Sequence, residues 1–133
     1  MRYTIKHTGT GMCLRRKWHE NHKLGMASIS CEEAKKFVYR LTLSGLVEEK
    51  YGGCIRNGND GFVYLKDGIN ECEKDGAKVR VEGEKIKHED LCLVPVSNKT
   101  EEDINLVFSS DCGSPMSKFK LDTGKQINLC FSI

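Results

Sequence analysis

The sequence predicts an all-β fold built from three copies of one unit of about 40 residues. A Cys-hydrophobe motif at Cys13 returns at Cys54 and again at Cys92, at intervals of 41 and 38 residues. In each copy a second cysteine follows after 18 to 20 residues, and a Lys-hydrophobe stretch comes next. Three landmarks that recur three times in the same order indicate internal repetition, which is a property of the whole architecture.

Short strands separated by turns are predicted throughout the chain. Apolar and polar residues alternate at period two over 3–6, 37–43 and 78–81, and residues 104–108 form a β-branched and aromatic run. Gly, Asn and Asp cluster between these runs, and these are the residue types that form turns. The segment 31–36 is the only helix-like stretch, and it is long enough for one or two turns.

Each unit therefore contains about four strands, and one such unit cannot bury its apolar face alone. Three units together can close a barrel and cap it, which leaves few exposed edges. Three units of four strands make a β-trefoil with pseudo-threefold symmetry. We expect one domain over residues 1–133, with repeats at about 1–44, 45–83 and 84–125. A further strand over 126–133 is expected beside the N-terminal strand or in a subunit contact.

The charge balance excludes a general attraction to polyanions. The chain has 21 basic and 19 acidic residues, with a net charge of +2. A nucleic-acid or anionic-membrane partner is therefore not expected. No apolar run approaches the roughly 20 residues that a membrane span needs, so membrane insertion is not expected either. The N-terminus is polar and strand-like, so a signal peptide was either removed before this numbering or never present.

Seven cysteines are many for a chain of this length. No Cys-x-x-Cys pair provides the usual zinc spacing, and six of the cysteines fall into one pair per repeat. We expect three disulfides, each stabilising by roughly 3 kcal/mol: Cys13–Cys31, Cys54–Cys72 and Cys92–Cys112. This predicts a secreted or extracellular-acting protein. The alternative is six buried free thiols inherited by duplication. Cys130 fits no repeat position and is either buried or paired with another chain, as in a homodimer.

At this point the residues resemble a known family. A Cys-hydrophobe pair after a turn and a second cysteine about 18 residues later, repeated three times, is similar to the pattern of ricin-type (R-type) lectin domains. The resemblance covers nearly the whole chain. It implies a β-trefoil that binds galactose-like sugars on glycoproteins or glycolipids, without a cofactor, a metal or an enzymatic activity.

The chain departs from the family at the sugar-binding positions. The family's Gln-x-Trp is replaced by Lys35-Lys36-Phe37, Ala77-Lys78-Val79 and Ser117-Lys118-Phe119. Its sugar-binding aspartate, two residues after the first cysteine, is replaced by Arg15, Arg56 and Val94. Its stacking aromatic, two residues before the second cysteine, is replaced by Ile29, Asn70 and Ser110. A sugar site therefore cannot be carried over residue by residue.

The loop of the first repeat, 15–22, holds one set of candidate sugar-binding residues: Arg15, Trp18, His19 and Asn21. An exposed Trp ring can cover the apolar face of a sugar, and Arg can bind a sulfate or carboxylate with two hydrogen bonds. This set suits a glycan with an acidic, sialyl or sulfo, group. The alternative is a Trp that lies over the barrel mouth among solvated charges.

The second repeat holds another candidate set: Arg56, Asn57, Asn59, Asp60 and Asn70. Amide and carboxylate side chains can each bind two adjacent hydroxyls of a neutral sugar. The alternative is that Asn-Gly and Asp-Gly only form turns here.

Catalytic motifs are not apparent. The four histidines are not spaced as metal ligands, and no nucleophile elbow or phosphate loop occurs. We therefore expect a non-enzymatic lectin for galactose- or GalNAc-type glycans. The alternative is a β-trefoil module that has lost sugar binding and binds a protein instead, because trefoils also host inhibitors and receptor-binding proteins.

Overall fold

The computed structural model describes residues 2–17, 22–28, 33, 37–43, 45–68, 72 and 78–123. These residues form an all-β fold of twelve strands with one 3-10 turn, η1 (Pro115–Ser117). The strands are β1 (Arg2–His7), β2 (Cys13–Arg16), β3 (Leu24–Ala27), β4 (Tyr39–Thr42), β5 (Gly45–Glu48), β6 (Cys54–Asn57), β7 (Val63–Lys66), β8 (Val79–Glu82), β9 (Lys85–His88), β10 (Leu91–Pro95), β11 (Ile104–Ser109) and β12 (Phe119–Thr123). The architecture is a β-trefoil, as the sequence predicts.

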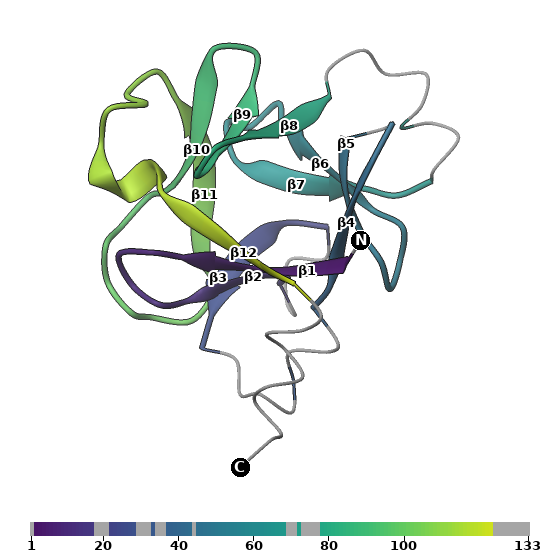
Figure 1. The fold of residues 1–133 in the computed structure, drawn as a ribbon, viewed down its shortest axis with the longest axis horizontal. Coiled ribbons are helices and arrows are strands. Elements are labelled where there is room, and N and C mark those ends of the chain that lie inside the picture. The colour runs from purple at the N-terminus through teal and green to yellow at the C-terminus, as the bar shows by residue number, and fades with distance from the viewer. Residues whose placement is uncertain are drawn as a thin grey trace.

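The barrel is formed by β1, β4, β5, β8, β9 and β12 (Figure 1). β1 pairs with β4 and β12, β4 pairs with β5, and β8 pairs with β9, all antiparallel. The first and last described strands close the barrel, because β12 runs beside β1 from Tyr3↔Thr123 to His7↔Phe119. The Phe119 amide also donates to the Glu84 carbonyl, 2.8 Å away, next to β9. The last described strand is therefore fixed on both sides.

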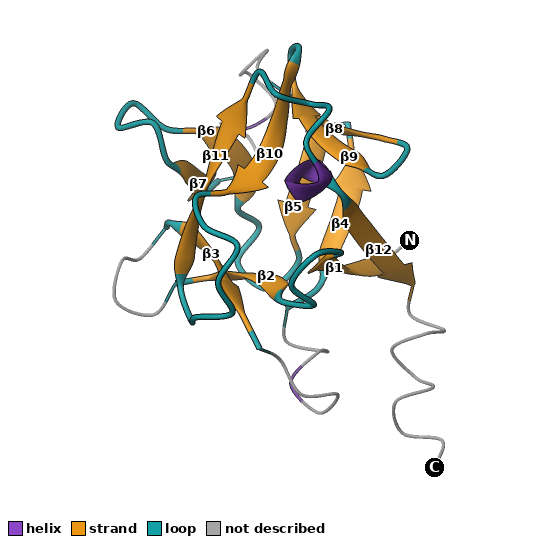
Figure 2. Cartoon of the chain, turned by 90° about the vertical axis from the view of Figure 1, so that its left-hand side faces the viewer, coloured by secondary structure: helices purple, strands orange, loops and turns teal. Residues whose placement is uncertain are grey.

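Three hairpins, β2–β3, β6–β7 and β10–β11, cap one end of the barrel (Figure 2). They contact one another, because β3 pairs with β11 and Lys23 forms a bridge with Tyr64 of β7. Cys13 and Cys54 are the first residues of β2 and β6, and Cys92 is the second residue of β10. The recurring motif thus marks the same strand in all three repeats, as expected from the pseudo-threefold symmetry.

The core lies between the barrel and the hairpin cap. It is built from fully or almost fully buried side chains: Ile5, Met12, Leu14, Leu24, Met26, Tyr39, Leu46, Ile55, Val63, Leu65, Val79, Ile86, Leu93, Ile104, Leu106 and Phe119. Equivalent strands contribute equivalent residues, such as Leu14, Ile55 and Leu93 from the hairpins. Burial of apolar area from all three repeats at once is the main driving force for this closure.

One register differs from the prediction. Tyr39 faces Glu48, as Val79 faces His88 and Phe119 faces His7. Tyr39 therefore occupies the core position that the sequence pattern had given to Phe37. The apolar residues at alternate positions of 37–43 also do not all face the core, since Leu41 is 49% exposed and Leu43 is 90% exposed. Apolar alternation fixes which side chains share a face of a strand, but it does not show where that strand leaves the barrel.

Two of the expected disulfides are present, Cys54–Cys72 and Cys92–Cys112. The first pairing needs correction, because Cys13 carries a free thiol and Cys31 lies outside the described residues. Sequence spacing makes the three cysteines equivalent, but a disulfide also requires the two Cβ atoms to approach within about 4 Å. Cys130 and the predicted strand 126–133 lie outside the described residues. Within the described part, no helix is long and apolar enough to cross a membrane.

Candidate functional site at the junction of the first two repeats

Arg15 is engaged within the protein rather than free on the surface. Its Nη2 lies 3.1 Å from Asp103 Oδ1 and 3.4 Å from Glu102 Oε2, and its side chain is 11% exposed. The ion pairs join β2 to the segment before β11. Arg15 therefore links the first and third repeats, and its guanidinium is already satisfied in part by two carboxylates.

Arg56 points inward, contrary to the expectation that it binds sugar. The residue is 2% exposed, and its guanidinium donates to the carbonyl of Ile55 at 2.9 Å and to that of Cys72 at 3.2 Å. A buried guanidinium needs such acceptors, because an unpaired charge in the interior is costly. The structure therefore removes Arg56 from the candidate glycan-binding residues.

Asn57, the last residue of β6, is exposed, and so are Asn59 and Asp60 in the turn between β6 and β7. Asp60 organises this turn, since it accepts a hydrogen bond from the Phe62 amide at 3.0 Å and forms an ion pair with Lys23. The hydrogen bonds from Lys23 and from the Phe62 amide lower the pKa of Asp60. Lys23 also lies over the Phe62 ring, 4.8 Å from its centroid. Trp18, His19, Asn21 and Asn70 lie outside the described residues.

The structure brings the two candidate loops together. Lys23, at the end of the first loop, forms a bridge with Tyr64 and an ion pair with Asp60. The Leu65 amide donates to the carbonyl of His22. We call the resulting area the junction surface, and it comprises Arg16, His22, Lys23, Tyr51, Asp60 and Asp67. Two stretches that are about 40 residues apart in the sequence therefore form one continuous face.

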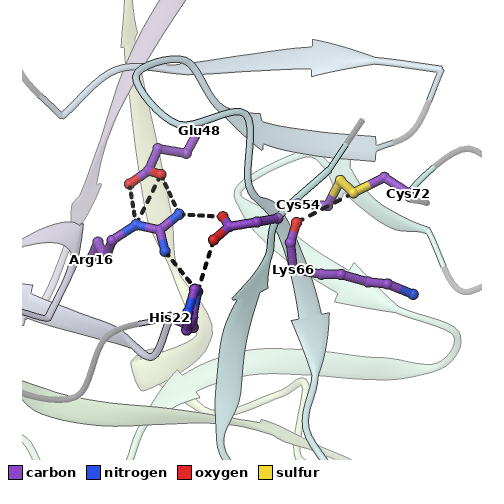
Figure 3. Close-up of polar contacts among 7 residues, drawn as sticks. Arg16, His22, Glu48, Cys54, Lys66 and Cys72 are labelled. Carbon is purple, nitrogen blue, oxygen red and sulfur yellow. Dashed lines mark hydrogen bonds and ion pairs between the residues drawn. A yellow bond between two sulfur atoms is a disulfide. The ribbon is translucent and has the colours of Figure 1, made fainter. Parts of the chain in front are cut away.

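Arg16 organises the junction surface from the end of β2. Its Nη2 lies 2.7 Å from Glu48 Oε1 and 2.9 Å from Asp67 Oδ1, and its Nε lies 3.1 Å from Glu48 Oε1 (Figure 3). The Arg16 and Glu48 side chains are only 10% and 5% exposed. Burial alone would lower the pKa of Arg16, but the hydrogen bonds and charges of Glu48 and Asp67 outweigh it and raise that pKa. Arg16 therefore stays charged and fixed in one orientation.

Asp67 presents a carboxylate that is held in place but still accessible. Oδ1 binds Arg16, and Oδ2 lies 2.9 Å from His22 Nδ1. The Asp67 side chain is 42% exposed. Each carboxylate oxygen has two acceptor sites, so each retains one for a further donor. This geometry suits a pair of neighbouring hydroxyl donors.

Tyr51 places an exposed aromatic ring beside the same arginine. The residue is 58% exposed, and its ring centroid lies 5.0 Å from Arg16 Cζ and 5.2 Å from Lys50 Nζ. It sits in the connection between β5 and β6, next to Gly52, whose positive φ of 71° favours glycine. Arg16 thus contacts both the aromatic ring and the carboxylate, and it holds them on one side of the molecule.

Close packing supports this arrangement from behind. A Cβ on Gly53 would lie 2.7 Å from Arg16 Nη2 and 3.1 Å from Asp67 Oδ1, so only glycine leaves room for their contact. The neighbouring Cys54 pairs across the hairpin with Lys66, and Cys72 Sγ lies 3.4 Å from the Lys66 carbonyl (Figure 3). The Cys54–Cys72 disulfide therefore secures the strand end from which Asp67 extends.

The site is not repeated three times. Arg16, Asn57 and Pro95 occupy equivalent positions, since they face Leu24, Val63 and Leu106 in their hairpins. Glu48 is likewise equivalent to His7 and His88, which face Phe119 and Val79 in the barrel. An arginine and a carboxylate therefore coincide only at the junction of the first two repeats.

Sequence reasoning missed most of the residues of this site. Glu48 was not among the predicted site residues, and it is 4% exposed. Its equivalence to His7 and His88, which are also buried, was a signal that could have placed it inside. Nothing in the sequence indicated that Tyr51 and Asp67 lie near Arg16. Across the described residues, no group of three His, Cys, Asp or Glu side chains is placed to hold a metal ion.

Comparisons with known proteins support the fold. No family model matches the chain, and no curated protein matches it by sequence. Among solved structures, the C-half of an earthworm R-type lectin in complex with GalNAc aligns with a TM-score of 0.74 at 14% identity, covering 91% of this chain and 97% of that one. The designed threefold-symmetric protein ThreeFoil aligns with a TM-score of 0.68 at 16% identity, covering 92% and 98%. The Rhizoctonia solani agglutinin aligns with a TM-score of 0.59 at 12% identity, covering 91% and 93%.

Proposed function

We propose that this chain is a carbohydrate-binding β-trefoil whose glycan site is the junction surface. One observation carries the proposal: Arg16 holds a half-exposed carboxylate, Asp67, and an exposed aromatic ring, Tyr51, at one place. Sugars offer hydroxyl donors at their edges and apolar C–H groups on their faces. A fixed acceptor beside an aromatic surface complements both features.

Asp67 would accept hydrogen bonds from two neighbouring hydroxyls of one sugar ring. Its two oxygens are oriented by different partners, Arg16 and His22, so the carboxylate does not need to be ordered on binding. Preorganisation of this kind lowers the entropic cost of association. Tyr51 would contact an apolar face of the same sugar. Glu48 is buried behind Arg16 and acts as a positioning residue.

For the sugar itself we propose a galactose- or GalNAc-type residue, carried on glycoproteins or glycolipids. The similarity of the repeats to R-type lectins and the GalNAc bound by the earthworm lectin support this choice. Trp18, His19 and Asn21 lie between Arg16 and His22 in the sequence, while Asn57 ends β6 and Asn59 lies in the turn that follows. We propose that these residues extend the site to further sugars of the glycan.

A glycan array followed by isothermal titration calorimetry tests the proposal. Tyr51→Ala and Asp67→Asn should abolish binding of the best glycan while the melting temperature stays within a few degrees of the wild type. Trp18→Ala should weaken it. Leu43→Ala is the matched control, because Leu43 is also an exposed apolar residue, in the β4–β5 connection. This variant should bind the glycan as the wild type does. Failure of the wild-type protein to bind any glycan would contradict the proposal.

We further propose that the protein acts outside the reducing cytosol as a binding module without turnover. The disulfides Cys54–Cys72 and Cys92–Cys112 support the first part, because such bonds persist in oxidising compartments. Incubation with the bound glycan, followed by mass spectrometry, checks the second. A cleaved or modified glycan would show that the chain is an enzyme.

A protein-binding module is the second candidate function. It is favoured by Leu41 and Leu43, two exposed apolar residues at the end of the β4–β5 hairpin. It is also favoured by Arg15 and Arg56, which are bound within the protein at positions where R-type lectins hold sugar. The two candidates differ in which substitution matters. Loss of cell-surface binding in Leu43→Ala but not in Tyr51→Ala, and its persistence after enzymatic deglycosylation, would support the protein partner.

A further inference from the structure

We infer that protonation of His22 converts the junction surface into a site for an acidic sugar, one that carries a carboxylate or a sulfate. The inference rests on the proposed function and concerns the regulation and ligand class of the same site. It follows from the position of one ring nitrogen, His22 Nδ1, between a hydrogen-bond donor and a hydrogen-bond acceptor.

His22 Nδ1 has two partners with opposite demands. It lies 2.9 Å from Asp67 Oδ2, which can only accept, and 3.2 Å from Arg16 Nη1, which can only donate. A neutral imidazole satisfies one of them at a time, depending on which nitrogen carries the proton. A protonated imidazole donates from both nitrogens, so it can bind Asp67 but not Arg16. The proton on His22 therefore decides which partner the ring binds.

Protonation leaves Arg16 Nη1 without its acceptor. The other donor atoms of Arg16 are unaffected, because Nε and Nη2 bind Glu48 and Nη2 also binds Asp67. His22 is 53% exposed at this point, so the space beside it is open to solvent. A guanidinium N–H and an imidazolium then lie next to each other, because Arg16 Nη1 is 3.2 Å from His22 Nδ1. Two charge-assisted donors side by side form a good binding place for a carboxylate or a sulfate.

Among the described residues, the charges at and near His22 balance while the ring is neutral. Arg16 from β2 and Asp67 after β7 contact the ring, Glu48 from β5 contacts Arg16, and Lys50 from the β5–β6 connection lies over Tyr51. Two of these are positive and two are negative. Lys23 and Asp60 add a further ion pair of zero net charge at the edge. Protonation of His22 therefore adds one positive charge to the junction surface, which favours an anionic ligand over a neutral one.

Histidine is the side chain that ordinarily changes charge between about pH 5 and pH 8. With the His22 ring neutral, the site should bind neutral and acidic forms of one glycan with similar strength. With the ring protonated, it should prefer the acidic form, because a new ionic hydrogen bond adds to the contacts with Asp67 and Tyr51.

The experiment uses three ligands with the same core: lactose, sialyl-lactose and sulfated lactose. Their dissociation constants are measured by calorimetry at about pH 7.5 and about pH 5.5. We expect acidification to strengthen binding of one or both acidic glycans roughly threefold to tenfold and to leave lactose unchanged. Whether the gain appears with the sialyl or the sulfated sugar identifies the anionic group. Circular dichroism at both pH values confirms that the protein remains folded.

His22→Asn is the matched variant, because Asn tolerates the left-handed backbone that His22 adopts at a φ of 78°. Its affinity for lactose, whatever its level, should be the same at both pH values, and it should lose the gain for acidic glycans. An equal gain in the variant would overturn the inference. Binding of all three ligands with no dependence on pH would overturn the inference alone. No binding of any ligand at either pH would overturn the proposed function as well.

Discussion

Arg16 of the first repeat and Glu48 of the second form an ion pair that is almost withdrawn from solvent, with Nη2 and Oε1 2.7 Å apart and side chains 10% and 5% exposed. It is made from a hairpin strand and a barrel strand, so it joins the cap to the barrel as well as one repeat to the next. On its outer side the same guanidinium orients Asp67 and contacts Tyr51. Stability and the proposed binding site are therefore coupled through one residue.

Removing one partner of this ion pair should be much more harmful than removing both. Glu48→Ala leaves the Arg16 charge buried without its main acceptor and should lower the free energy of unfolding by roughly 3 kcal/mol. The double variant Arg16→Met/Glu48→Leu should recover much of this loss, because apolar side chains of similar volume can replace a buried pair. Urea unfolding of both single variants and the double variant measures the coupling. Additive losses would show that the pair is not coupled.

Gly53→Ala should damage the glycan site more than the fold. The new Cβ would lie 2.7 Å from Arg16 Nη2 and 3.1 Å from Asp67 Oδ1, so it would separate the two groups. We expect affinity for the glycan to fall by about tenfold, equivalent to one charge-assisted hydrogen bond. Gly113→Ala is the control, because its Cβ would meet only Asp111 at an ordinary 3.8 Å. Calorimetry compares the two variants, and unchanged binding in Gly53→Ala would argue against an Arg16–Asp67 site.

Stability should decline below about pH 6.5 because of His7. Burial lowers the pKa of His7 from its ordinary 6.5, although the hydrogen bond to the Met116 carbonyl opposes this. The ring is neutral in the folded state: Nδ1 accepts from the Thr10 amide at 3.3 Å, and Nε2 donates to the Met116 carbonyl at 2.9 Å. As the pH falls, the unfolded chain takes up a proton at His7 before the folded chain does, so folding becomes less favourable.

The variant His7→Gln tests this source of pH dependence, because a glutamine amide can accept from Thr10 and donate to Met116 without titrating. Chemical unfolding between about pH 8 and pH 5 should show a weaker decline in this variant than in the wild type. An unchanged decline in His7→Gln would assign it to other groups.

The Cys54–Cys72 disulfide should matter for both stability and binding. Replacing both cysteines with serine opens a loop of 18 residues and should cost about 3 kcal/mol. It should also weaken glycan binding, because Cys72 contacts Lys66 and its carbonyl accepts from Arg56, next to the strand end that bears Asp67. Cys13→Ser is the control, since Cys13 carries a free, partly exposed thiol. Urea unfolding should separate the two variants, and similar losses in both would contradict this role.

The sequence by itself determined the architecture. Each repeat carries its own strands, turns and cysteine motif, and Cys13, Cys54 and Cys92 fall on equivalent strands. Such landmarks are local, so they can be read without knowing which segments meet. Three units that each leave an apolar face uncovered have to bury it against one another, and the trefoil does this.

Only the tertiary structure decided where a site can lie. Glu48 and Asp67 lie 32 and 51 residues after Arg16 in the sequence. The three residues meet because the hairpin of one repeat packs against the barrel and hairpin of the next. The inward turn of Arg56 and the shift from Phe37 to Tyr39 in the core have the same origin. Whether a side chain faces solvent, a partner or the core depends on contacts between repeats, and no pattern within one repeat records those contacts.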